Sequence, residues 1–170
     1  MDEAFRAILL IGLTAAALTT LALTLNWWME PERRLRRAML KSLGVPADAE
    51  AVSPAEGKAA GLGFETGQIA VLWGRGANGL VYDFHEIEGG EIIVDGHVVA
   101  RIRRGEPRKS LDVLAPEAEL VTLRLMFADA RYPEFELSLW NANVPTQTGS
   151  PAEALRLGRR WLSHLEALLK

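Results

Sequence analysis

An apolar stretch near the N-terminus limits most strongly what this chain can fold into. Residues 7–25 carry no charged side chain, and nine of them are Leu or Ile. Because an α-helix rises about 1.5 Å per residue, the stretch would be roughly 28 Å long, close to the roughly 30 Å hydrocarbon core of a bilayer. Trp27 and Trp28 follow it, as in the aromatic belt at a membrane interface. The pattern predicts a transmembrane anchor over residues 1–29.

The charges that flank this stretch predict its orientation. One cation, Arg6, precedes it, and five follow it: Arg33, Arg34, Arg36, Arg37 and Lys41. Cations of single-pass proteins gather on the cytoplasmic side, so the N-terminus is expected outside and the rest of the chain in the cytoplasm. The alternative is a signal peptide cleaved at the alanines 15–17. That alternative needs a positive N-terminal segment, and the acids within residues 1–6 cancel its charge.

One face of the predicted span carries small residues at every fourth position. These residues are Gly12, Ala16, Thr20 and Thr24. Small side chains allow two helices to approach closely in lipid, so this face is a candidate for helix packing. The other interpretation is an anchor that packs against no second helix, and both stay open.

Residues 30–57 predict a short basic helix followed by a linker. Pro31 can begin a helix and Gly44 can end it, with apolar residues at helical spacing between them. The cations that follow the span would lie among anionic lipid headgroups, or would only set the orientation. Pro46, Pro54 and Gly57 are typical of a linker over residues 45–57.

Residues 58–170 predict a mainly antiparallel β-domain with one C-terminal helix. Short apolar segments alternate with turn signals, of which Asp95 followed by Gly96 is the strongest hairpin signal. Strands are expected at 59–64, 68–73, 80–84, 91–94, 97–103, 121–127 and 135–139. Ser150 and Glu153 form a capping box around Pro151, and the apolar stripe of the helix that follows must be covered. The predicted fold class is therefore α+β: a transmembrane helix, then a β-barrel or half-barrel that the C-terminal helix closes.

Several of these segments resemble bacterial pleckstrin-homology-like domains. They are residues 63–72, 81–91 and 95–96, the strand opening at 132–135, and the capped helix that contains Trp161 and Leu162. In that family, antiparallel hairpins build a barrel and a C-terminal helix closes one end. The resemblance covers residues 59–170 and is carried mostly by packing and turn residues. It implies a bacterial inner-membrane protein with a binding or scaffolding role, and it supplies no catalytic residue.

The sequence also excludes or disfavours several kinds of chemistry. The chain has no cysteine, so it has no disulfide, thiolate metal site or cysteine nucleophile. Its net charge of −3 argues against nucleic-acid binding. Residues 74–79 match the glycine pattern of dinucleotide-binding loops, but a strand follows them instead of the required helix. The histidines lie on separate elements, and no serine has a nucleophile-elbow context. We expect no catalysis, cofactor, metal or small-molecule substrate.

A second basic cluster supplies candidate contact residues for a partner or for lipid. It comprises Arg101, Arg103, Arg104, Arg108 and Lys109. Trp140 is added because its apolar neighbours Phe135, Leu137 and Leu139 have the opposite phase along the strand. The favoured hypothesis is a non-catalytic accessory or scaffolding subunit that docks its span and β-domain onto a larger integral membrane complex. The alternative is a peripheral sensor in which this cluster binds anionic lipid headgroups.

Overall fold

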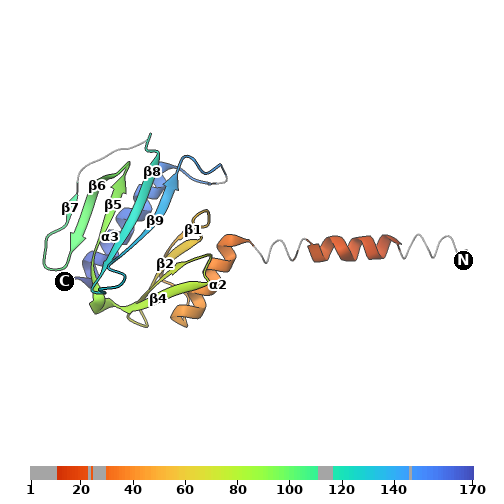
Figure 1. The fold of residues 1–170 in the computed structure, drawn as a ribbon, viewed down its shortest axis with the longest axis horizontal. Coiled ribbons are helices and arrows are strands. Elements are labelled where there is room, and N and C mark those ends of the chain that lie inside the picture. Colours follow the sequence, from red (N-terminus) through yellow and green to blue (C-terminus); the bar gives the residue numbers. More distant parts are fainter. Residues whose placement is uncertain (1–10, 23, 25–29, 111–116, 146) are drawn as a thin grey trace, which may run out of the picture.

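The computed structural model describes residues 11–22, 24, 30–110, 117–145 and 147–170. Two antiparallel sheets form the body of the described chain, and each is covered by a helix (Figure 1). The first sheet has the strand order β1 (Ala49–Ser53), β2 (Lys58–Gly63), β3 (Gln68–Trp73), β4 (Asn78–Asp83). The second has the order β7 (Lys109–Ser110), β6 (His97–Arg103), β5 (Ile87–Val94), β8 (Leu120–Phe127), β9 (Glu134–Asn141). The helices are α2 (Pro31–Leu43) and α3 (Pro151–Leu168), and a 3-10 turn, η1 (Phe84–Glu86), links the sheets.

The N-terminal apolar stretch does not form the predicted membrane span. Its described part, residues 11–22 and 24, is helical. Among the described residues, every helix is too short or too polar to cross a bilayer. The predicted anchor, its single-pass orientation and the inner-membrane location are therefore wrong. Trp27 and Trp28 lie outside the described residues.

Helix α2 packs on one face of the first sheet through an apolar stripe. Leu35, Met39 and Leu43 are buried in a cluster with Ala59 and Ala70 of the sheet. The helix ends at Gly44, whose φ of 74° allows its N–H to bond the Leu40 carbonyl. The predicted linker over residues 45–57 contains strand β1, which pairs with β2. Alanine and glutamate have low strand propensity, so this strand depends on its neighbours and not on its own composition.

Small residues on the sheet allow α2 to lie this close. A Cβ atom added at Gly61 would lie 2.7 Å from Met39 Sδ and 3.1 Å from the Ala47 Cβ. We expect Gly61→Val to lower the free energy of unfolding by about 1–3 kcal/mol, because the added methyl groups would overpack this contact. Urea unfolding followed by circular dichroism measures the loss. Met39→Ala is destabilising by itself, but the loss in the double variant should be smaller than the sum of the two single losses, since the smaller side chain makes room for valine. A Gly61→Val chain as stable as the wild type would contradict this packing.

Helix α3 covers one face of the second sheet, and one core joins both sheets to it. Trp161, Leu162 and Leu165 are fully buried in a cluster that also contains Leu62 and Ile69 of the first sheet. Two glycines bring helix and sheet together: a Cβ atom would lie 3.1 Å from Ile92 at Gly158 and 2.5 Å from Leu165 at Gly90. The predicted cap is present, since the Ser150 side chain accepts a hydrogen bond from the Glu153 N–H at 3.3 Å.

The predicted barrel or half-barrel closed by a C-terminal helix is wrong, because the strands form two separate sheets. The chain leaves the first sheet at Asp83 and enters the second through η1. Where β9 meets the β1–β2 turn, side chains replace a strand ladder. Lys58 Nζ donates to the Glu136 carbonyl at 2.8 Å, and the Ser138 N–H donates to Glu56 Oε2 at 3.2 Å. These side chains occupy outward backbone groups of β9 at Glu136 and Ser138, so no backbone hydrogen-bond ladder connects the two sheets there.

Candidate functional site

A pocket lies between the first sheet and the beginning of β9, and we refer to it as the aromatic pocket. It is a cavity of about 260 Å³. Five aromatic residues line it: Trp73, Tyr82, Phe127, Tyr132 and Phe135. Val71 and Leu80 add aliphatic surface, and Lys58, Glu134 and Glu136 add charge. Because these residues come from five strands and the β8–β9 connection, only the folded chain brings them together.

The inner wall of the aromatic pocket is buried and its outer ring is exposed. The rings of Tyr82 and Phe127 are both buried and stack with centroids 4.2 Å apart. Tyr132 is 51% exposed and lies against Trp73, with ring centroids 5.9 Å apart. Asp129 holds the connection that carries Tyr132, since it accepts hydrogen bonds from the Tyr132 and Arg131 N–H groups at 3.3 and 2.8 Å. The pocket is therefore preformed, with one aromatic ring at its mouth.

Hydrogen bonding fixes the protonation of the pocket wall. The Tyr82 hydroxyl donates to Asp129 Oδ2 at 2.9 Å. Burial, together with this carboxylate, raises the pKa of Tyr82, so the phenol stays neutral. The Arg131 N–H and the Tyr82 hydroxyl lower the pKa of Asp129, so its carboxylate stays charged at neutral pH. The residues that line the pocket include no serine, threonine, cysteine or histidine. The site is thus suited to burying an apolar group beside acidic side chains.

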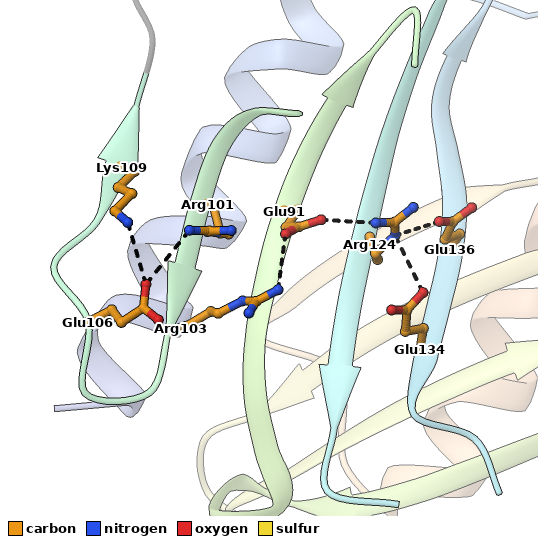
Figure 2. Close-up of polar contacts among 8 residues, drawn as sticks. All are labelled: Glu91, Arg101, Arg103, Glu106, Lys109, Arg124, Glu134 and Glu136. Atoms are coloured by element: carbon orange, nitrogen blue, oxygen red, sulfur yellow. Dashed lines mark hydrogen bonds and ion pairs between the residues drawn. The ribbon is translucent and has the colours of Figure 1, made fainter. Parts of the chain in front are cut away.

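A row of charged residues crosses the face of the second sheet that is opposite α3 (Figure 2). Its members come from all five strands and the β6–β7 loop: Lys109, Glu106, Arg101, Arg103, Glu91, Arg124, Glu134 and Glu136. Glu91 is only 4% exposed, because Arg124 Nη1 lies 3.0 Å and Arg103 Nη2 3.8 Å from its carboxylate oxygens. A hydrogen bond from Arg124 to Glu136 raises the pKa of Arg124. This charged row holds a buried carboxylate within a surface network.

The predicted contact cluster is divided among three places in the fold. Arg101, Arg103 and Lys109 belong to the charged row, where Glu106 and Glu91 neutralise them. Arg104 Nη2 donates to the His85 carbonyl at 3.0 Å and the Ile87 carbonyl at 2.6 Å, and so supports η1. The alternation of the strand placed Arg101 and Arg103 on one face. Their acidic partners lie on other strands or across a loop, so the sequence did not indicate them.

The remaining two contact candidates make structural bonds. Arg108 Nη1 donates to Ser163 Oγ at 3.2 Å and lies 3.6 Å from Glu166, which ties its loop to α3. Trp140 is partly buried against the main core, and its Nε1 donates to the Ala118 carbonyl at 3.1 Å. The Trp140 indole thus packs and bonds within the domain. The aromatic pocket was not predicted from the sequence; the local signal for it was the aromatic residue pair Tyr132 and Phe135 around the start of β9.

The N-terminal candidate residues stay predictions. All four small residues of the predicted packing face are helical and exposed: Gly12, Ala16, Thr20 and Thr24. The hydroxyls of Thr20 and Thr24 donate hydrogen bonds to carbonyls of their own helix. A Cβ atom at Gly12 would meet nothing within 4 Å in the described chain.

The cations of α2 lie on or near its exposed side. Arg33 pairs with Glu30, and Arg36 pairs with Glu32 and Glu50. Arg37 Nε donates to the Arg33 carbonyl at 3.3 Å, and Arg34 and Lys41 are exposed. Their predicted contact with lipid headgroups stays a prediction.

The structure brings two acids to one histidine. Ligand atoms of Asp83, His85 and Glu86 lie within 4.8 Å of one another. The carboxylate of Glu86 accepts the Asp83 N–H at 2.8 Å, and Asp83 accepts from Gln68 Nε2 at 3.2 Å, so both acids serve the local turn. The other two histidines, His97 and His164, lie on other elements.

As expected, the glycine-rich residues 74–79 end in a strand and not a helix.

Comparisons with known proteins do not assign this site. No protein-family model matches the chain, and no curated protein or solved structure matches it. The resemblance to pleckstrin-homology-like domains therefore stays a prediction.

Proposed function

We propose that this chain is a non-catalytic binding module, an accessory or scaffolding subunit of a larger protein complex, and that the aromatic pocket is its contact site. One observation carries the proposal: five aromatic rings surround a preformed cavity whose outer ring, Tyr132, is half exposed. Aromatic residues around a pocket are the most common anchors of protein interfaces. At about 260 Å³, the cavity is smaller than the roughly 300–1,000 Å³ of sites for small molecules. Its size suits one large side chain.

The charges favour a protein partner over a lipid headgroup. An anionic headgroup needs unpaired cations, but the contact cluster is bonded to carboxylates, carbonyls or a hydroxyl within the described chain. Two carboxylates, Glu134 and Glu136, and one ammonium line the pocket. Both carboxylates share the guanidinium of Arg124 with Glu91, so acid exceeds base at the mouth of the pocket. A partner that buries an apolar side chain with a basic residue beside it would match both features.

Replacing Tyr132 by alanine tests this function. We expect binding to the partner to weaken by about tenfold or more, because truncating an aromatic anchor at an interface costs over 1–2 kcal/mol. The fold should be kept, since Tyr132 is exposed. The measurement is quantitative mass spectrometry of proteins that co-purify with the tagged full chain. Phe64→Ala is the matched control, because Phe64 is an aromatic residue of similar exposure, 43%, outside the pocket. Equal recovery of partners by both variants would overturn the proposal.

A further inference from the structure

The described sheets end in the strands β1, β4, β7 and β9, and the edges of β9 and β1 are occupied. On β9, Lys58 and Glu56 bond the outward backbone groups of Glu136 and Ser138. Gln147 does the same further along, with bonds to the Leu139 carbonyl and the Asn141 N–H. β1 lies beside β9, and β7 is described over Lys109–Ser110, directly before residues that the structure does not describe. Proteins usually block sheet edges in such ways, because an unblocked edge pairs with other chains.

Strand β4 has an open edge. It pairs only with β3 among the described strands. The Phe84 N–H donates to the Gly67 carbonyl at 2.9 Å, and hydrogen-bonded pairs alternate along an antiparallel ladder. Counting along the register from this pair, Leu80 and Tyr82 bond β3, whereas the backbone groups of Gly79 and Val81 point away from it. Residues 76–82 carry no charged side chain, and Gly79 and Val81 are exposed. The edge therefore lacks the charges that normally prevent strand addition.

This open edge lies directly beside the aromatic pocket. Leu80 and Tyr82 of β4 point into the pocket and line it. Side chains directly opposite one another on adjacent antiparallel strands lie about 4.5–5.5 Å apart at their Cβ atoms. A strand added to β4 would thus place every second side chain next to Leu80 and Tyr82, over the cavity. Strand addition of this kind combines backbone bonds with pockets for alternate side chains.

We propose that β4 is a docking strand: an extended segment of a partner protein adds to its free edge and inserts one large apolar side chain into the aromatic pocket. The segment carries Lys or Arg next to that residue, because the exposed Glu134 at the pocket has only a share in Arg124, which also pairs with Glu91 and Glu136, and the exposed Asp83 ends β4. Lys58 is engaged by Glu56 and the Glu136 carbonyl, so it does not offset these acids. This inference rests on the proposed function and specifies how the partner binds.

A random linear peptide library displayed on phage and selected on the full chain tests this inference. Selected peptides are expected to contain a large apolar residue beside Lys or Arg, and to lose binding to the Tyr132→Ala chain. Each amide of a selected peptide is then N-methylated in turn, and affinity is measured by calorimetry. We expect losses of about fivefold or more at alternate positions only, because every second amide bonds β4 in an added strand.

Two variants of the chain test the same edge from the other side. Val81→Pro removes an outward N–H, which edge strands tolerate, and should weaken peptide binding to a similar extent. Val81→Ala keeps the N–H and should bind as the wild type does. Circular dichroism confirms that both are folded; the N-methyl scan decides the question if Val81→Pro is not.

The outcomes separate this inference from the proposed function. Peptides that need Tyr132 but show no alternation overturn strand addition and leave the pocket as the contact site. Peptides that bind Tyr132→Ala as well as the wild type count against the pocket itself. A library that yields no peptide overturns the docking strand, and the co-purification experiment then judges the proposed function alone. A wild-type dimer that Val81→Pro converts to a monomer in sedimentation would show that a second copy occupies the edge, which also overturns the proposal.

Discussion

Replacing Trp161 by alanine is expected to lower the free energy of unfolding by about 3–5 kcal/mol, the usual loss when a large aromatic side chain is deleted from a core. Trp161 is 0% exposed and has the largest of the fully buried side chains. It lies on α3 within the cluster that joins both sheets, so its removal leaves a cavity between helix and strands that the rigid sheet cannot close. The loss is measured by urea unfolding.

A second substitution at this position separates packing from hydrogen bonding. The Trp161 Nε1 atom is buried, and no described residue accepts a hydrogen bond from it. Trp161→Phe keeps an aromatic ring in the core and removes this unpaired donor, so its loss should be clearly smaller than that of Trp161→Ala. Trp140→Ala is the comparison: the Trp140 indole is only partly buried, so its loss should be smaller than that of Trp161→Ala. A Trp161→Ala loss of about 0.5 kcal/mol, as for surface substitutions, would show that α3 does not cover the sheet as described.

Replacing Arg124 by methionine is expected to cost about 3 kcal/mol, because it leaves the carboxylate of Glu91 buried without its nearest cation. Arg124 Nη1 lies 3.0 Å from that carboxylate, and Arg103, at 3.8 Å, replaces it only in part. Arg103→Met is the matched control, and its loss should stay within the roughly 0–1 kcal/mol of exposed ion pairs, since Arg103 is largely solvated. Equal losses for the two arginine variants would contradict the central place of Arg124 in the charged row.

The partner substitution completes a double-mutant cycle. Glu91→Met should cost less than Arg124→Met, because Arg124 would keep Glu134 and Glu136 on β9. The double variant should recover much of the Arg124→Met loss, since apolar side chains of similar volume often replace a buried ion pair without net loss. Losses that simply add in the double variant would mean that the two side chains are not coupled.

Local signals in the sequence were enough to find several elements. The Ser150–Glu153 bond begins α3, Gly44 ends α2, and Asp95 with Gly96 turns β5 into β6. In each case, residues within one turn of the chain determine the backbone by their own φ values or hydrogen bonds, so the neighbours in sequence are also the neighbours in space. The alternation in β6 and β8 likewise placed Arg101 and Arg124 on a solvent-facing side.

Tertiary structure decided which strands belong to each sheet and which side chains lie next to one another. The sequence pattern predicted a membrane span, a linker over β1 and one barrel, whereas no helix of the described residues can span a membrane, β1 is paired, and the strands form two sheets. The Glu91–Arg124 pair joins residues 33 positions apart, and the aromatic pocket gathers rings from β3, β4, β8, β9 and the β8–β9 connection. Periodicity assigns a side chain to one face of its own strand, but strand order and register choose the strand beside it. Strand order and register depend on which arrangement buries the whole core, and the sequence of a single strand does not contain that information.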